Sequence, residues 1–407
     1  MSFFRGFSTN VACTGLAFAI GLANQSLLAH GLGPEGRGVY GIVATTVMLG
    51  GLLFGEWLSR GNAYIAGKEP QATGSVMSNG LLFTVALLTV MLLGSRLLVC
   101  LNLHPPGLQT TALSVMSLII VMTVLQRAAQ GVLLGRDRIG AYAIVPVLFI
   151  SVYLGGNVWV LQHTAYGIDG VLIAWTGASV VAAVVAAVAV GQFGSPSLSQ
   201  LRCTAAVGGR GAVSTTLIFL LFRSDVYLVG LFLGAAPLGI YSVALVVAEM
   251  VQRLPNVAGA TLLPKVIGGS DDDHLLSLRV TRLVLLFSLA TGVGILLVGE
   301  PLLTWVFSEA FSGSIVPLRW MLPGLIASGY SSVLNTKLAG HGYPKITIMA
   351  PAVALAANVT LNLVLIPALE LRGAALATSI SYALWAFIIT AAYQRRTGVR
   401  WRDFLPL

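Results

Sequence analysis

An arginine and an aspartate lie deep inside an apolar stretch of the second half of the chain, in the run FLLFRSDVYLVG. Arg223 comes about 12 residues after this stretch begins, which is roughly 18 Å along a helix. Charged groups at such depth in a membrane are costly and usually face a partner or a wet cavity. Residues i and i+2 do not face each other on a helix, so Asp225 cannot simply neutralise Arg223 along one surface. Each side chain therefore needs a partner on another helix or in a cavity.

These two side chains favour different roles. The planar guanidinium of Arg223 can pair bidentately with phosphate oxygens, which predicts a contact with an anionic substrate in a cavity. A structural ion pair between helices is the alternative for Arg223, and it is the favoured role for Asp225. Asp225 would then hold Arg223 in place or carry a coupling proton.

Further polar residues inside apolar stretches are weaker candidates for substrate binding. Comparable places in the two halves of the chain are occupied by Gln126, Arg127 and Gln130, and by Asn335 and Lys337. They would line the inner mouth of a substrate path. Arg127 and Lys337, however, are close enough to the membrane interface for snorkelling to be the favoured interpretation.

Three asparagines lie near the middle of apolar stretches. Asn157 and Asn358 occupy equivalent positions, and Asn362 follows Asn358 by one helical turn. Hydrogen bonding between helices is favoured over substrate contact for these residues.

Two acid–base pairs are spaced four residues apart near the ends of apolar stretches, Glu56 with Arg60 and Glu249 with Arg253. Residues at this spacing are neighbours on a helix. We therefore interpret both as structural ion pairs.

The sequence carries no recognisable catalytic or metal-binding pattern. Its three cysteines and five histidines are scattered without metal-ligand spacing. The run Gly31 to Gly36 matches the dinucleotide-binding pattern G-x-G-x-x-G, but it lies between two apolar stretches with no βαβ unit around it. We expect no enzyme activity, no cofactor and no metal.

Composition identifies the solvent of most of the surface as lipid. Hydrophobic residues make up 57% of the chain and charged residues 9%, whereas soluble domains carry about 25% charged residues. A helix needs about 20 apolar residues to cross a bilayer, and lipid does not tolerate open strand edges. We therefore predict an all-α polytopic membrane protein with about 12 transmembrane helices, at residues 9–30, 38–58, 79–100, 109–133, 140–161, 168–191, 211–233, 238–263, 280–299, 316–338, 345–367 and 372–393.

The positive charges predict the orientation. With the N-terminus inside, 18 of the 23 lysines and arginines fall on the cytoplasmic side, and so does the C-terminus. The net charge of +9 is therefore explained by membrane topology rather than by nucleic-acid binding.

A nine-residue sequence motif near the start of the chain is repeated near its midpoint. Residues 32–40 read LGPEGRGVY and residues 233–241 read LGAAPLGIY, an offset of 201 that also relates Asn157 to Asn358. Six spans is an even number, so the halves are parallel repeats. We predict an N-terminal lobe (1–200) and a C-terminal lobe (201–407), two parallel six-helix lobes around a central cavity, which is typical of alternating access.

The chain resembles the polysaccharide (O-antigen, Wzx-type) flippases of the multidrug/oligosaccharidyl-lipid/polysaccharide exporter superfamily. The similarity runs from the first span to the last, in LGPEGRGVYGIVAT, RSDVYLVGLFLGAAPLGIYSVA, EPLLTWVFSEAFSGSIVPLRWMLPG and NVTLNLVLIPALELRGAALATSISYALW. It implies V-shaped lobes around a cationic cavity in a bacterial inner membrane. The implied substrate is a polyprenyl-pyrophosphate-linked oligosaccharide, turned from the cytoplasmic to the outer leaflet. Arg223 would contact its headgroup, and Arg319, which matches the family's PLR, would assist on the exit side.

Other functions stay open at this point. A multidrug or small-solute antiporter of the same superfamily would have the same spans. A membrane glycan polymerase or ligase is disfavoured because the outer linkers are short and poor in histidine and carboxylates. Expected partners are the lipid-linked oligosaccharide, membrane lipids, a coupling ion (proton or sodium) and a polysaccharide polymerase, with no nucleic acid.

Overall fold

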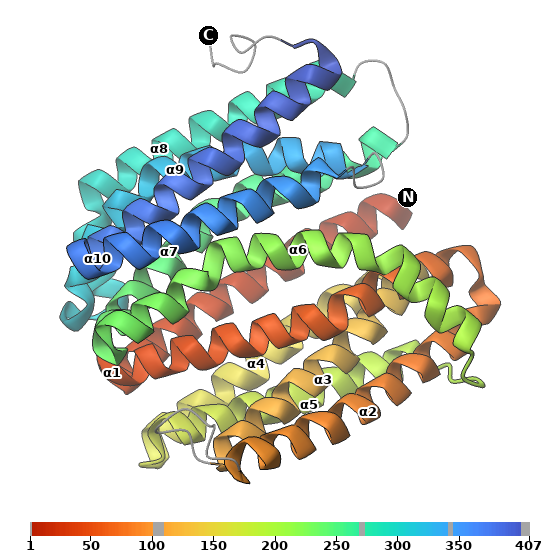
Figure 1. The fold of residues 1–407 in the computed structure, drawn as a ribbon. Coiled ribbons are helices and arrows are strands. Elements are labelled where there is room, and N and C mark those ends of the chain that lie inside the picture. Colours follow the sequence, from red (N-terminus) through yellow and green to blue (C-terminus); the bar gives the residue numbers. More distant parts are fainter. Residues whose placement is uncertain (1, 101–109, 268–272, 341–344, 400–407) are drawn as a thin grey trace. The chain divides into compact units, whose positions relative to one another are not determined.

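The computed structural model describes residues 2–100, 110–267, 273–340 and 345–399, and these contain helices and turns but no strand (Figure 1). The residues from Arg400 onward, which the charge pattern assigns to the cytoplasmic side, lie outside the described part. The elements are α1 (Ser2–Lys68), η1 (Pro70–Ala72), α2 (Thr73–Cys100), α3 (Thr110–Gly135), α4 (Ile139–His163), α5 (Gly167–Val190), α6 (Leu198–Leu233), α7 (Ala235–Ile267), α8 (Asp273–Phe307), η2 (Glu309–Ser314), α9 (Ile315–Gly340) and α10 (Ile346–Thr397).

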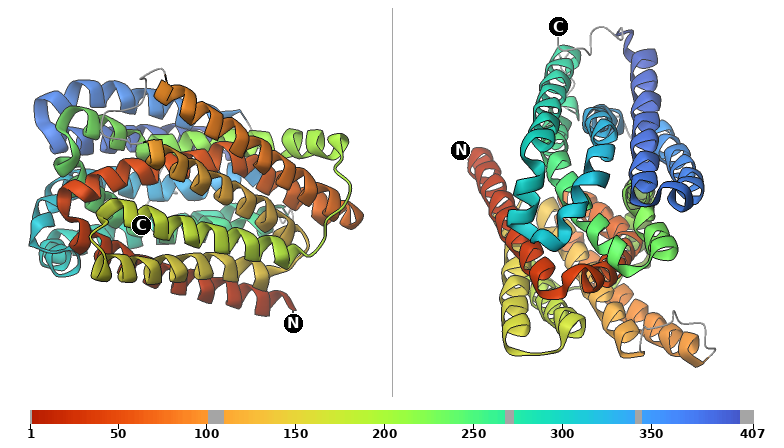
Figure 2. Two further views of the ribbon diagram at one scale, coloured as in Figure 1. Left: turned by 90° about the horizontal axis from the view of Figure 1, so that it is seen from below. Right: turned by 90° about the vertical axis from the view of Figure 1, so that its left-hand side faces the viewer.

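The two longest helices, α1 and α10, are each divided by a break. An unbroken helix of 67 residues such as α1 would be roughly 100 Å long, several times the thickness of a bilayer. In α1 the backbone leaves the helix at Gly33, with φ 62° and ψ −177°, a conformation almost restricted to glycine. In α10 the break is at Glu370, with φ 51°. Figures 1 and 2 show that the chain turns back at each break.

The predicted number of spans is confirmed. Ten helices of the described residues are long and apolar enough to cross a membrane. Because α1 and α10 each supply two spans across their breaks, these helices provide twelve. The chain is an all-α, multi-pass membrane protein.

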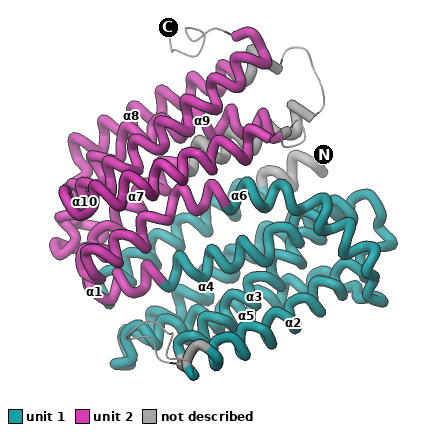
Figure 3. The backbone as a smooth tube through the Cα atoms, in the orientation of Figure 1, with its two compact units in different colours: residues 1–32, 43–216 teal, residues 33–42, 217–407 magenta. Residues whose placement is uncertain are grey.

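The chain forms two compact units (Figure 3). Unit 1 comprises residues 1–32 and 43–216, and unit 2 comprises residues 33–42 and 217–407. The change from one unit to the other therefore falls inside α6, and the ten residues after the first span belong to unit 2.

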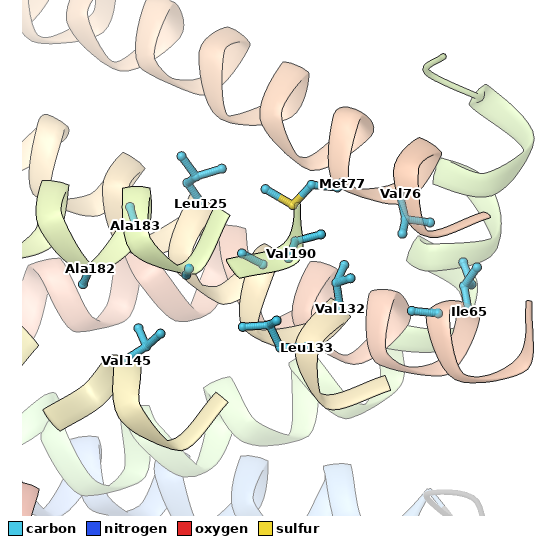
Figure 4. Packing of buried hydrophobic residues seen from close by; sticks show 13 residues of the cluster. Ile65, Val76, Met77, Leu125, Val132, Leu133, Val145, Ala182, Ala183 and Val190 are labelled. Atoms are coloured by element: carbon cyan, nitrogen blue, oxygen red, sulfur yellow. The ribbon is translucent and has the colours of Figure 1, made fainter. Parts of the chain in front are cut away.

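Small residues let the helices of unit 1 approach one another closely. A cluster of buried side chains joins the later part of α1 with α2, α3, α4 and α5, including Met77, Leu133 and Val145 (Figure 4). A Cβ atom on Gly131 or Gly135 of α3 would overlap backbone carbonyl oxygens of α1. The spacing G-x-x-x-G thus provides close backbone contact here, as is common between membrane helices.

In unit 2 the two copies of the repeated motif pack against each other. A Cβ atom on Gly38 would overlap the carbonyl oxygen of Ala235, and one on Gly239 would overlap that of Pro34. The offset of 201 relates Gly38 to Gly239 and Pro34 to Ala235, so the two contacts are reciprocal, as a local two-fold arrangement requires. Each copy therefore has glycine where the carbonyl of the other copy approaches.

Candidate functional site

Arg223 lies in the part of α6 that belongs to unit 2, and its side chain is only 15% exposed. Its Nη2 atom forms an ion pair with Oε1 of Glu249 on α7. Gly234, with φ 86°, forms the turn between these helices and allows α7 to return beside α6. The expected partner on another helix is thus Glu249, for which the spacing predicted a pair with Arg253. The side chain of Arg253 lies outside the described part of the chain.

Asp225 is 1% exposed and is held by hydroxyl groups from two other helical segments. Its Oδ2 atom accepts hydrogen bonds from Tyr241 Oη of α7 at 2.5 Å and from Thr378 Oγ1 of α10 at 3.2 Å. Its Oδ1 atom is buried and has no hydrogen-bond partner within the described residues. The carboxylate and the Arg223 guanidinium therefore have different partners, as their i, i+2 spacing requires.

The first half of α10 adds two fully buried amides, one of which contacts Ser224, the residue before Asp225. Ser224 Oγ donates to Asn358 Oδ1 at 3.0 Å, and Asn362 Nδ2 donates to the same oxygen at 2.9 Å. The Oδ1 atom of Asn362 is buried and has no partner in the described part of the chain. We call this set the Asp225 cluster; its members are Ser224, Asp225, Tyr241, Asn358, Asn362 and Thr378.

The Asp225 cluster contains two buried oxygens, Asp225 Oδ1 and Asn362 Oδ1, that have no donor within the described residues. Buried acceptors without donors are rare and call for an explanation such as a bound ion. Carboxylate, amide and hydroxyl oxygens are ligands that suit hard cations. Among the described residues, no group of three or more His, Cys, Asp and Glu side chains is placed to hold a metal ion.

Unit 1 has a polar contact at the position equivalent to part of this cluster. Asn157 Nδ2 of α4 donates to Asn24 Oδ1 of α1 at 2.8 Å, and both side chains are buried. The offset of 201 relates Asn157 to Asn358 and Asn24 to Asp225. Asn157 thus forms the expected bond between helices.

A second ionic cluster lies in unit 1. Glu56 Oε1 pairs with Arg60 Nε at 2.9 Å, and Glu56 Oε2 pairs with Arg127 Nη1 of α3 at 2.6 Å. Gln126 and Gln130 are half-buried on the same helix α3. Arg127 therefore forms an ion pair with another helix in addition to any contact with the interface.

The two basic candidates of α9 lie far apart along that helix. Arg319 is 43% exposed near its start and forms a loose pair with Glu300, with 3.6 Å between Nη2 and Oε2; exposed pairs of this kind contribute little. Lys337, near the other end, is 3% exposed, and its ammonium lies 5.8 Å from the centre of the Tyr393 ring. The side chain of Lys337 is thus buried among the helices.

Of the predicted residues, the structure brings together Arg223, Asp225, Asn358 and Asn362 in one region of unit 2. Sequence reasoning missed Tyr241 and Thr378 as partners of Asp225, and Asn24 as the partner of Asn157. The repeat could have indicated both the tyrosine and the asparagine, because Tyr241 is the last residue of the repeated motif and Asn24 is the counterpart of Asp225. Thr378 has no comparable signal in the sequence.

Solved transporter structures have the same fold as this chain. An inward-facing multidrug resistance MATE family transporter of the MOP superfamily aligns with a TM-score of 0.76 at 17% identity, covering 93% of this chain and 94% of that one. The lipid II flippase MurJ, in an inward closed conformation, aligns with a TM-score of 0.79 at 15% identity, covering 97% of this chain and 88% of MurJ. The fold is that of the MATE and MurJ transporters.

One curated relative is similar in sequence. The probable low-salt glycan biosynthesis flippase Agl15 of Haloferax volcanii is 22% identical over 281 residues, which are 66% of this chain and 58% of Agl15. The chain thus matches less than two thirds of the length of that relative. No protein-family model matches the chain.

Proposed function

We propose that this protein is a flippase that moves polyprenyl-pyrophosphate-linked oligosaccharides from the cytoplasmic to the outer leaflet by alternating access. The observation that carries the proposal is the largely buried guanidinium of Arg223, held between α6 and α7 in the middle of a predicted span. A pyrophosphate cannot cross hydrocarbon without a compensating charge. Arginine meets phosphate with a rigid set of five donors, and Glu249 contacts one of its nitrogens.

We infer that the Asp225 cluster binds the coupling ion, a proton or sodium. The support is the buried carboxylate oxygen of Asp225 and the buried amide oxygen of Asn362, which lack donors in the described residues. Binding of a cation there would change the charge one turn or less from Arg223, and so would alter the affinity of Arg223 for an anion. This proximity offers a physical link between ion binding and substrate release.

The proposal also covers the arrangement in the cell. Lobes 1–200 and 201–407 would open alternately to either side of a bacterial inner membrane, with both termini in the cytoplasm. Agl15, named as a probable flippase of glycan biosynthesis, supports this choice of substrate class. A polysaccharide polymerase would then receive the product on the outer side.

The experiment is depletion of the protein in its own cell, followed by mass spectrometry of polyprenyl-linked glycans. We expect a complete, unpolymerised repeat unit to accumulate on its carrier. Complementation with Arg223→Gln should restore export at least about tenfold less than wild type, because a charge-assisted contact is lost. Arg96→Gln, which changes an exposed arginine of α2, is the matched control and should complement fully. Full complementation by Arg223→Gln at equal protein level would overturn the assignment of Arg223.

The second candidate function is export of drugs or small solutes, favoured by the likeness to the MATE transporter. An unchanged pool of lipid-linked glycans together with increased drug sensitivity after depletion would select this function over the flippase.

A further inference from the structure

We propose that Arg60 and Arg127, bridged by Glu56, form a second anion site in unit 1, suited to a phosphate or pyrophosphate group. The assignment of the lipid headgroup as its ligand rests on the proposed flippase function. The anion site itself rests on the geometry of three helical segments, namely the second half of α1, α3 and the first part of α6.

Two guanidiniums share one carboxylate in this cluster. The two carboxylate oxygens of Glu56 are divided between two guanidiniums, at 2.9 Å from Arg60 Nε and 2.6 Å from Arg127 Nη1. Each guanidinium contacts a different oxygen of Glu56. An ion pair between α1 and α3 needs one arginine, and the second arginine at the same carboxylate adds a further set of hydrogen-bond donors.

Both arginines stay accessible although their positions are fixed. About a third of each side chain is exposed, 35% for Arg60 and 32% for Arg127, whereas Glu56 is 12% exposed. Arg60 Nη2 also donates to Thr215 Oγ1 of α6 at 3.0 Å. The carboxylate is therefore the more enclosed member, and the two arginine side chains are the more accessible ones.

Glycines provide the space in which the two arginine side chains lie. A Cβ atom on Gly55 would come within 2.9 Å of Arg127 Cδ, and one on Gly211 would come within 3.0 Å of Arg60 Cδ. Gly51, one turn before Gly55, also borders Arg127. The two stems therefore lie against helix backbone at places where any larger residue would displace them, which keeps the two guanidiniums in a defined arrangement.

In this arrangement the carboxylate of Glu56 contacts the two arginines to which we assign binding of the ligand's anionic group. Each of its two oxygens accepts from a different arginine, and two oxygens of one phosphate or pyrophosphate group could be shared between the two arginines in the same way. An arriving pyrophosphate carries more charge than a carboxylate and can replace Glu56 as the partner of Arg127. Because Arg60 and Arg127 lie near the predicted cytoplasmic ends of their spans, the site would receive a headgroup before it reaches Arg223.

The test measures pyrophosphate binding to the purified full chain in which Arg223→Gln already silences the proposed central contact. In this background, Arg127→Gln should weaken binding of inorganic pyrophosphate at least about tenfold. Glu56→Gln should strengthen it, since a competing anion is removed. Arg210→Gln is the matched control, because Arg210 is an exposed residue of α6 next to Gly211.

The opposite signs of these effects separate a binding site from a structural ion pair. Thermal unfolding of each variant, and Arg127→Lys as a variant that keeps the charge, show whether a loss of binding reflects a loss of folding. Binding that is unchanged by Arg127→Gln and not improved by Glu56→Gln in folded protein would overturn the site.

A second arm identifies the source of the anion. Nanodiscs containing a polyprenyl pyrophosphate should compete with inorganic pyrophosphate at this cluster, as expected for a lipid headgroup. If the lipid-containing nanodiscs left the binding of inorganic pyrophosphate unchanged, that result would contradict the headgroup assignment. Normal pyrophosphate binding with no lipid export in cells would count against the proposed function and leave the anion site standing.

Discussion

The first and seventh spans occupy equivalent places in the repeat, yet only the seventh is charged in its middle. The offset of 201 pairs Leu22 with Arg223 and Asn24 with Asp225 in these two spans, and it pairs Met48 of the second span with Glu249 of the eighth. Both spans make a polar contact with an asparagine, Asn24 with Asn157 in unit 1 and Ser224 with Asn358 in unit 2.

The second ionic cluster shows the opposite distribution. Glu56 and Arg60 of the first half correspond to Val257 and Thr261 of the second. Each half therefore carries ionisable groups where the other half is neutral.

This difference separates what the repeat needs for packing from what it adds for function. Neutral hydrogen bonds and glycine contacts join helices at modest cost in a membrane and recur in both copies. Charged side chains are energetically costly there, and the charged positions of each of these two clusters are neutral in the other half. A backbone with an internal repeat thus carries an asymmetric distribution of charge.

Making the second half resemble the first should have the largest effect. The triple change Arg223→Leu, Asp225→Asn and Glu249→Met reproduces the equivalent residues of the first half. We expect export to fall about 100-fold, since the charge-assisted contacts to phosphate are lost. Stability should change little, because removing the three charged groups together leaves none of them unpaired.

Lipid-linked glycan analysis and thermal unfolding of the triple variant measure these two effects. Export at the wild-type rate would show that the charges of the second half are structural. A large loss of stability would point the same way.

The next largest effect is expected on stability, from substitutions at the reciprocal contact between the two copies of the motif. Gly38→Ala and Gly239→Ala each place a Cβ atom against a carbonyl oxygen of the other copy. We expect each to destabilise the protein by about 1–3 kcal/mol, as overpacking does, and by similar amounts.

Thermal unfolding in detergent measures the two glycine variants side by side. Gly155→Ala is the control, because nothing lies within 4 Å of a Cβ atom at that position. A cost at only one of the two sites would contradict the reciprocity.

The smallest effect should come from the two asparagines. Asn157→Ala removes one bond to Asn24 and should cost about 1 kcal/mol or less. Asn358→Ala leaves both Ser224 and Asn362 without their acceptor and should cost about 2 kcal/mol.

The unfolding midpoints of the two asparagine variants, compared with Thr360→Ala on the exposed side of α10, provide the measurement. An equal loss of stability at the two positions would show that Asn358 contributes no more to packing than Asn157 does.

Much of the fold could be predicted because the bilayer imposes it. Spans of about 20 residues follow from the thickness of the hydrocarbon, and helices follow from the need to satisfy every backbone group within lipid. The breaks in α1 and α10 fall between predicted spans for the same reason.

The partners in the site were harder to predict. Sequence spacing did not predict that the carboxylate of Glu249 contacts Arg223. It also did not predict that Lys337 is buried beside Tyr393. Both cases depend on the rotation of a helix about its axis, which places a side chain toward a neighbouring helix or toward lipid.

The sequence by itself determined the solvent, the number of spans, the repeat and the presence of charge in the middle of the seventh span, because each follows from composition, length or spacing along one chain. Only the tertiary structure decided three contacts. The carboxylate of Asp225 accepts hydrogen bonds from Tyr241 and Thr378, Arg127 forms an ion pair with Glu56, and the two copies of the motif pack against each other. The physical reason is that a helix offers several faces. Which of them meets a given neighbour is set by the close packing of all the helices together.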